Sequence, residues 1–178
     1  MQAETASLAT VTIRIGCEAD LPALEWDGEY RHFRQVYRWA MDEARRGQRA
    51  LLVAEVEGLV VGQLFVQFRG TDTSGERGGR YGYLHAFRVR PLYRNRGIGT
   101  RLVTEAETML RQRGCGKALL AVALANQPAL ALYQRLGYTV TGRDRGEWAY
   151  LDHQGRVCHV HEPSYVLEKP LTPATRLQ

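Results

Sequence analysis

The stretch 90–107, RPLYRNRGIGTRLVTEAE, contains four arginines and two glycines in its first twelve residues. It follows Tyr81–Val89, an alternating segment that predicts a strand. It leads into apolar residues at helical spacing, namely Ile98, Leu102, Val103, Ala106, Met109 and Leu110. This pattern predicts a helix that ends at Gly114. The stretch is therefore a cationic turn between a strand and a helix.

The residues of this turn are of the kinds that bind phosphate groups. The first N–H groups of a helix have no partner within the helix, and that end carries a partial positive charge. Gly97 and Gly99 have no side chain to keep a ligand away from the main chain, and Arg94 and Arg96 can donate charged hydrogen bonds. The sequence therefore predicts that a diphosphate binds at the start of this helix.

Two common nucleotide-binding motifs do not fit this turn. A P-loop requires Gly-Lys-Ser/Thr, and a dinucleotide-binding turn requires a third glycine where this chain has Leu102. Residues 76–114 nevertheless hold nine arginines and three glutamates, a local charge of +6 in a chain whose net charge is +5. This clustering favours an anionic ligand, although a solvated helix face would have the same composition.

The rest of the chain divides into short elements. Strands are expected at Val11–Ile15 and Ala118–Leu124, with a hairpin over 50–68 that turns at Glu57-Gly58. Helices are expected from Asp20, as an N-cap before Pro22, over 29–47, and from Asn126 to Gly137. A mobile loop is expected at 69–80, and two or three strands within 138–171 around a turn at Asp152–Gly155. This order predicts an α/β domain with a mixed sheet.

Length and composition indicate one domain over 11–171, with a flexible N-terminus at 1–10 and a tail at 172–178. No apolar run approaches the ~20 residues of a membrane span, and no signal-peptide pattern is visible. The cysteines, Cys17, Cys115 and Cys158, do not suggest a disulfide framework. We therefore expect a cytoplasmic protein that does not bind membranes.

Two stretches together resemble the GNAT superfamily of N-acetyltransferases. Arg94-Asn95-Arg96-Gly97-Ile98-Gly99, after an apolar strand, is similar to the acetyl-CoA motif of that family. LANQPALALYQRLGY is similar to its second signature, carried here by Asn126, Tyr133, Gly137 and Tyr138. The resemblance implies the GNAT fold: a mixed, mostly antiparallel sheet of six to seven strands, with helices on both faces and splayed central strands.

The resemblance also implies how acetyl-CoA would be held as co-substrate. The pantetheine would lie between the strands YLHAFRV and ALLAVAL, against backbone groups of Phe87 and Val89, with Asn126 on its arm. The diphosphate would be bound by Arg94, Asn95, Arg96, Gly97, Ile98, Gly99 and Thr100. Tyr133 would reach the thioester sulfur and protonate the leaving thiolate. A tyrosine that only packs with Leu130 and Leu136 would fit the same pattern.

Members of the family often carry a Glu or His base on the strand that leads to the cofactor, and YGYLHAFRVR contains no glutamate. Tyr83, His85, Phe87 and Val89 are expected to alternate onto one face of this strand. His85 titrates near neutral pH and is the expected base, with Tyr83 able to orient a water. A histidine with purely structural hydrogen bonds is the alternative.

The amine acceptor is expected between the early helices and the closing strands. Acids beside aromatic rings suit a cationic amine, and the candidates are Glu25, Trp26, Glu29, Tyr30, Trp148 and Tyr150. The acids would equally complement a helix dipole. We expect no metal site at Cys158, His159 and His161, because a strand directs the cysteine away from both histidines and zinc would need a fourth ligand.

The resulting prediction is an N-acetyltransferase that moves an acetyl group from acetyl-CoA directly to a primary amine of a small molecule or a peptide, without a metal. A non-catalytic acetyl-CoA sensor is the alternative. Nucleic-acid binding is not expected, because the basic patch is confined to the region of the predicted cofactor turn. A homodimer would agree with the family, and the sequence does not identify the acceptor.

Overall fold

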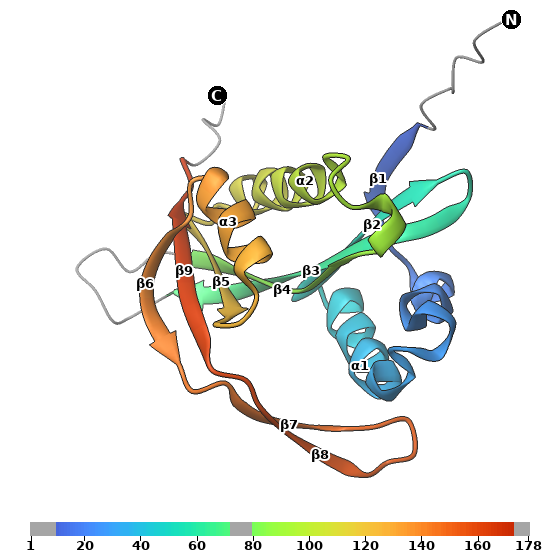
Figure 1. Ribbon diagram of the computed structural model, residues 1–178. Helices are drawn as coiled ribbons and strands as arrows, with labels where there is room; N and C mark the ends of the chain where they lie inside the picture. The colour runs from blue at the N-terminus through green and yellow to red at the C-terminus, as the bar shows by residue number, and fades with distance from the viewer. Residues whose placement is uncertain (1–9, 72–79, 173–178) are drawn as a thin grey trace, which may run out of the picture.

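The computed structural model of the chain describes residues 10–71 and 80–172. Its centre is a seven-stranded sheet in the order β1-β2-β3-β4-β5-β9-β6 (Figure 1). The strands are β1 Val11–Ile15, β2 Arg49–Val56, β3 Leu59–Thr71, β4 Arg80–Val89, β5 Lys117–Ala123, β6 Thr139–Asp144 and β9 Ser164–Pro170. Neighbouring strands of this sheet are antiparallel, except that β4 and β5 are parallel. The predicted mixed, mostly antiparallel sheet is confirmed.

Helices cover both faces of the sheet, as predicted (Figure 1). Helix α1 (Arg34–Arg45) lies on one face, and α2 (Ile98–Gln112) and α3 (Gln127–Arg135) lie on the other. Because strand side chains alternate between the two faces, the core has two parts. The part that packs against α2 and α3 includes Leu64, Leu84, Leu102 and Leu167. The part beneath α1 includes Leu24, Tyr37, Leu51 and Phe65.

The first helical segment begins earlier than predicted. Glu18–Gly28 forms 3₁₀ turns that start after Cys17, so Asp20 is the third residue of the segment and not its N-cap. The Asp20 carboxylate is held by Arg14 at 2.8 Å and accepts a hydrogen bond from the N–H of Cys17, also at 2.8 Å. The ion pair with Arg14 of β1 therefore holds Asp20 inside the first turn of the segment, whereas an N-cap position was predicted for it.

Helix α1 is shorter than the helix predicted over 29–47. The backbone of Trp26 and Asp27 is left-handed, with φ values of 46° and 59°, and a separate 3₁₀ turn at Arg31–Phe33 precedes α1. The left-handed residues end the first helical segment. Phe33, the residue before α1, has φ −90° and ψ 4°, outside the helical range, so the α-helix itself begins only at Arg34. The segment does end at Gly47 as predicted, where the Gly47 N–H donates to the Ala44 carbonyl.

The hairpin predicted over 50–68 is confirmed, since β2 and β3 pair antiparallel on either side of Glu57-Gly58. The mobile loop predicted at 69–80 lies mostly outside the described residues, as do the predicted N-terminus and tail apart from Thr10 and Thr172. Within the described residues, no helix has the length and apolar character needed to cross a membrane.

The closing segment contains four strands in place of the predicted two or three. After β6 the chain leaves the sheet as the separate hairpin β7 (Glu147–Leu151) and β8 (Val157–His161), and it returns as β9 (Figure 1). The turn predicted at Asp152–Gly155 is confirmed at the tip of this hairpin. At its base, a Cβ on Gly146 (φ 66°) would lie 1.8 Å from the Glu162 carbonyl oxygen. Only glycine, which has no Cβ, allows the segments at Gly146 and Glu162 to pass each other this closely.

Candidate active site

The parallel pairing of β4 and β5 stops partway along the two strands. The ladder runs from Tyr81 opposite Lys117 to Leu84 opposite Leu120, and no pair continues it in the described residues. The second halves of both strands therefore lie next to each other without a shared ladder. Their main-chain groups are available to a ligand that enters between them, because an unpaired strand edge presents free N–H and C=O groups.

A β-bulge in β4 lies directly after this point. Gln63 of β3 is opposite Arg88, but Phe65 is opposite His85, so β4 has one extra residue in the interval. Ala86 takes a left-handed backbone with a φ of 51° to accommodate it. The extra residue reverses the alternation of side chains beyond Ala86.

The predicted shared face of Tyr83, His85, Phe87 and Val89 is therefore wrong. Tyr83 and His85 lie on the α1 face, where their rings stack with centroids 6.0 Å apart. Phe87 and Val89 belong to the core on the α2 face. Arg88, which sequence reasoning placed in no site, joins His85 on the α1 face. Side chains alternate strictly in a regular strand, but a bulge interrupts this alternation. No glycine or proline in this part of β4 indicates the bulge in the sequence.

The turn before α2 has the backbone that a ligand-binding helix start requires. Asn95 and Gly97 are left-handed, with φ values of 59° and 76°, and α2 begins immediately after Gly97. A Cβ on Gly97 would meet no protein atom within 4 Å. Ile98 is buried in the core, whereas Arg94, Arg96 and Thr100 are exposed around the turn. The first N–H groups of α2, which have no partner within the helix, therefore lie at a turn with space beside Gly97 and with the exposed side chains of Arg94, Arg96 and Thr100 around it.

Gly99 has a different role from the one that the sequence suggested. A Cβ at Gly99 would lie 2.9 Å from Cζ of Phe87 and 3.5 Å from Cδ2 of Leu132. The missing side chain thus lets α2 pack closely on β4 and α3, in addition to any access for a ligand.

Arg94 is partly engaged within the protein. Its Nε donates to the carbonyl oxygen of Val89 at 2.9 Å, which ties the turn to the end of β4. Arg96 lies over the ring of Tyr93, with its Cζ 5.6 Å from the ring centroid. The free guanidinium nitrogens of both residues remain exposed to an anion.

Tyr133 lies on α3 with only 4% of its surface exposed. Its ring packs edge-on against Phe87 (centroids 5.9 Å apart) and Tyr138 (5.4 Å). Burial raises the pKa of Tyr133 above its ordinary value, and the nearby Tyr83 raises it further. The hydroxyl has no hydrogen-bond partner among the described residues. Tyr133 is therefore protonated at neutral pH and keeps a donor beside the strand that carries Phe87.

Asn126 caps α3, as its position before Pro128 predicted. Its side-chain oxygen accepts a hydrogen bond from the Ala129 N–H at 3.3 Å, and the residue is exposed. The amide NH₂ of Asn126 is not used in this cap, so it remains available to a ligand.

His85 is neutral and fixed by a neighbouring arginine. Arg49 Nη1 lies 2.7 Å from His85 Nε2, and because arginine only donates, Nε2 accepts and the ring proton is on Nδ1. Burial, followed by the charges of Arg49 and Arg69, lowers the pKa of His85 to about 3. The lone pair that a general base would use is occupied by this hydrogen bond.

The partner of His85 is itself buried and paired. Arg49 is 5% exposed, and its Nη2 lies 2.5 Å from Glu43 Oε2. Trp39 covers the guanidinium, whose Cζ is 5.1 Å from the ring centroid. Burial lowers the pKa of Arg49 despite the opposing effect of Glu43, yet the group stays charged because arginine titrates so far above neutral pH. His85 thus ends a chain of fixed polar contacts that runs back to α1.

Tyr83 is half-buried beside His85. Its pKa is raised by burial first and by the charge of Asp144 second. Tyr83 therefore keeps its proton at neutral pH and can donate a hydrogen bond, as the proposed orientation of a water would require.

Aromatic rings from separate elements meet on the α1 face. Phe33 lies 4.9 Å from Tyr150 and 6.3 Å from Trp148 between ring centroids, so the β7–β8 hairpin touches the segment before α1. Tyr30 and Tyr37 are 6.5 Å and 6.1 Å from Phe33. We call these five residues, Tyr30, Phe33, Tyr37, Trp148 and Tyr150, the aromatic cluster. Phe33 and Tyr37 were visible in the sequence only as part of a helical stripe.

The predicted acidic residues have other partners. Glu25 is bound by Arg34 through both oxygens, at 2.6 Å and 2.7 Å, and this pairing lowers the pKa of the carboxyl group. Trp26 is buried and packs edge-on against Tyr30. Glu29 is exposed and interacts with the hydroxyl of Tyr30, whose pKa is raised by burial first and by Glu29 second. Of the acceptor residues predicted near the N-terminus, Tyr30 alone belongs to the aromatic cluster.

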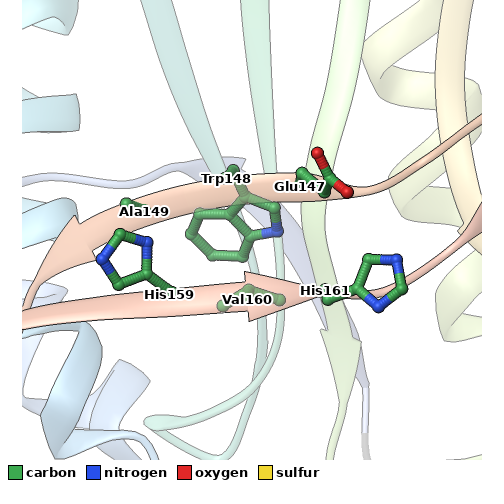
Figure 2. Close-up of a pocket in the computed structure, with 6 residues that line it drawn as sticks. All are labelled: Glu147, Trp148, Ala149, His159, Val160 and His161. Carbon is green, nitrogen blue, oxygen red and sulfur yellow. The ribbon is translucent and has the colours of Figure 1, made fainter.

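A pocket lies on the β7–β8 hairpin, with two histidines and an acid around it. It is lined by Glu147, Trp148, Ala149, His159, Val160 and His161, which Figure 2 shows along the two strands. His159 is opposite Ala149 and His161 is opposite Glu147, while Cys158 pairs with Tyr150 on the other face, as the predicted alternation requires. In the described part of the chain, no group of three or more His, Cys, Asp or Glu is placed to hold a metal ion.

The sequence and the fold match one family. Residues 17–138 match the model of the Acetyltransferase (GNAT) family. Similar solved structures include Arabidopsis thaliana NAA60 in complex with a bisubstrate analogue, which is 21% identical, with 93% of this chain and 100% of that chain covered at a TM-score of 0.71. The ribosomal-protein-S18-alanine N-acetyltransferase of Escherichia coli is 20% identical, with 95% and 99% covered at a TM-score of 0.65.

A third structure shares the same arrangement. The PaiA N-acetyltransferase of Thermoplasma acidophilum, in complex with coenzyme A, is 16% identical, with 90% of this chain and 99% of that chain covered at a TM-score of 0.68. At these identities the structures show the fold, and the family model covers well over half of the chain. The chain belongs to the GNAT family of acetyltransferases.

Proposed function

We propose that this protein transfers the acetyl group of acetyl-CoA directly to a primary amine. The observation that carries the proposal is the end of the β4–β5 ladder at Leu84 and Leu120: beyond it, β4 carries Phe87, which packs against Tyr133, and then leads into the turn before α2. A long thioester with a diphosphate at one end fits such an arrangement. Coenzyme A in the PaiA complex and acetyl-CoA in a second NAA60 structure are ligands of proteins with this fold.

The donor would be held largely by main-chain groups. The N–H groups of residues 95–100 would bind the diphosphate, where the helix end is partly positive and Gly97 leaves space. Arg94 and Arg96 would add charged hydrogen bonds. Backbone groups of Phe87 and Val89 would hold the pantetheine and the thioester carbonyl, with Asn126 on the pantetheine arm.

Acetyl transfer requires a group that gives a proton to the departing sulfur atom. The amine nitrogen attacks the thioester carbonyl carbon, the C–N bond forms, the C–S bond breaks, and the amine loses one proton while the thiolate gains one. Tyr133 would supply the proton to the thiolate. Burial raises the pKa of Tyr133, and it also raises the pKa of a thiol formed beside Tyr133. The difference between the two pKa values is therefore smaller than it would be if only the tyrosine were buried.

The acceptor that we propose is an amine whose pKa is low enough for it to lose its proton without a protein base. The Nε2 of His85 accepts a hydrogen bond from Arg49, so His85 is not available as the base. The α-amine of a peptide, with an ordinary pKa of about 7.7–8.0, is substantially neutral near pH 7.5, whereas a lysine, at about 10.4, is not. We therefore favour an α-amine, whose proton passes to solvent, with Tyr83 as a hydrogen-bond donor near the path.

The aromatic cluster would form the acceptor site. Its rings come from the segment before α1, from α1 itself and from the β7–β8 hairpin, on the side of β4 to which His85 points. An Arabidopsis thaliana Naa50 structure with the same fold contains the bisubstrate analogue CoA-Ac-MVNAL, in which a peptide follows the acetyl group. A peptide or amino-acid α-amine is therefore the acceptor class that we propose.

The test is the release of free CoA thiol from acetyl-CoA in the presence of an amine panel. We expect Tyr133→Phe to lower kcat about 100-fold or more, because it removes the proton donor and keeps the ring contacts with Phe87 and Tyr138. Tyr138→Phe is the matched control, since it removes a hydroxyl from the neighbouring buried ring and should leave kcat unchanged.

An unchanged kcat in Tyr133→Phe would remove Tyr133 from the mechanism. Tight binding of acetyl-CoA with no acetylation of any amine in the panel would instead support a non-catalytic sensor. Both variants should melt within a few degrees of the wild type, because the ring packing is retained in each.

A further inference from the structure

Arg88 occupies the centre of the aromatic cluster. The bulge at Ala86 turns its side chain onto the α1 face, where its Cζ lies 3.8 Å from the centroid of the Tyr30 ring and 5.1 Å from that of Phe33. Its Nη1 donates a hydrogen bond to the hydroxyl of Tyr37. A half-buried guanidinium is thus fixed by ring faces and one hydroxyl.

Three other arginines around this site have acidic partners, whereas Arg88 has none among the described residues. Arg34 is paired with Glu25, Arg49 with Glu43, and Arg90 with Asp27 at 3.2 Å. The remaining donors of Arg88 are arranged as a planar fork that matches a carboxylate. A half-buried, immobilised cation without a counter-charge is a ready site for an anion.

The position of Arg88 also reverses the charge that the sequence suggested for the acceptor. The aromatic face of Tyr30 was expected to receive a cationic amine, but it already holds the guanidinium of Arg88, which also lies over the Phe33 ring. A second positive group at the same rings would be repelled by Arg88. Of the two predicted acids, Glu25 is bound by Arg34, and Glu29 is exposed beside the hydroxyl of Tyr30. The cluster therefore disfavours polyamines and favours a negatively charged group.

Arg88 is also close in the chain to the proposed point of reaction. It lies between Phe87 and Val89, whose main chain would hold the pantetheine and thioester carbonyl, yet its side chain points to the acceptor face. A carboxylate bound by Arg88 would therefore lie within a few bonds of the reacting nitrogen of the same acceptor.

We propose that Arg88 selects acceptors that carry a carboxylate within a few bonds of the α-amine. This inference rests on the proposed function. The carboxylate has two chemical sources: the α-carboxylate of a free amino acid, or the side chain of an Asp or Glu at the first position of a peptide. Arg88 would form a bidentate pair with either one.

The experiment compares matched acceptors by kcat/KM. Peptides that begin with Glu or Gln and share the remaining residues test the side-chain carboxylate. Methionine against methioninamide tests the α-carboxylate, with each kcat/KM referred to the neutral amine, because the α-carboxylate itself raises the pKa of the amine. We expect a preference of at least tenfold for the acidic member of at least one pair, expressed in KM. Arg88→Gln should reduce that preference to about one, and Arg88→Lys should keep part of it, because lysine retains the charge without the fork.

Arg90→Gln is the matched control, since Arg90 lies just beyond the end of β4 and already has Asp27 as its partner. It should keep the wild-type preference. Melting temperature and the Kd for acetyl-CoA should be similar in all the variants, which separates selection from folding. Equal kcat/KM for both members of each pair in the wild type would overturn the inference and leave the acetyltransferase proposal intact. Absence of acetylation for every acceptor would instead count against the acetyltransferase proposal itself.

Discussion

His85 shows how one buried residue can couple acidity to folding. Its pKa is about 3 in the folded protein and about 6.5 when it is exposed, so between these values the unfolded chain binds a proton that the folded chain does not. The stabilising effect of the neutral ring is therefore complete above about pH 6.5 and is lost progressively as the pH falls toward 3.

We expect the free energy of unfolding to fall by up to about 2 kcal/mol between pH 7 and pH 5 because of His85. Urea denaturation at both pH values checks this. His85→Gln is the comparison, since a glutamine oxygen can accept from Arg49 but does not titrate. Asp20 and Glu25, whose pKa values are lowered by their arginines, contribute only below this window. Equal pH dependence in the wild type and in His85→Gln would contradict the shift.

Single residues were predictable from the sequence where a local motif defines their role. Gly97 and Asn126 fall where the turn and the helix cap require them. The role of His85 was not predictable, because it depends on Arg49, which is 36 residues earlier in the chain and reaches His85 across β3. No pattern within a strand can indicate a partner that another strand supplies.

At the scale of elements, the two glycines of the turn should respond differently to alanine. Gly99→Ala places a Cβ against the Phe87 ring and should cost about 1–3 kcal/mol of unfolding free energy. Gly97→Ala meets no protein atom and should cost about 1 kcal/mol, through its left-handed backbone.

A double-mutant cycle with Phe87→Leu separates these two causes. The smaller leucine should relieve the crowding, so Gly99→Ala and Phe87→Leu should be clearly non-additive in urea denaturation, whereas Gly97→Ala and Phe87→Leu should be additive. Additivity in both pairs would show that α2 does not press on β4 through Gly99.

Strands and helices were predictable where periodicity is regular, as in the β2–β3 hairpin, α2 and α3. Irregular places were not. The bulge at Ala86 and the left-handed Trp26 occur at residues with no special preference for such backbones, and tertiary contacts impose them. The crossing at Gly146 could be suspected from a glycine, but its meaning depends on Glu162, far along the chain.

At the scale of the molecule, the concentration of arginines over 76–114 should make cofactor binding sensitive to salt. A local charge of +6 around the turn attracts an anionic coenzyme through interactions that salt screens. We expect the Kd for coenzyme A, measured by calorimetry, to rise about tenfold between 50 and 500 mM NaCl. Pantetheine, which lacks the phosphates, is the control and should bind with little salt dependence. Equal salt dependence for both ligands would place the coenzyme phosphates away from the turn.

The order of elements was enough to predict the fold class, because a strand, a cationic turn and a helix at fixed spacing are local features. The acceptor side was not predictable as a unit. It brings together Tyr30, Arg88 and Trp148 from distant parts of the chain, and only the folded sheet places them side by side.

The interrupted ladder between β4 and β5 has a consequence for how such a protein can diverge. If the coenzyme is recognised through peptide groups, most side-chain replacements along that edge leave donor affinity unchanged. The opposite face of the same strand, where Arg88 projects, changes its chemistry with every replacement. Related proteins can therefore keep the same acetyl donor and change their acceptor through single substitutions on this one strand.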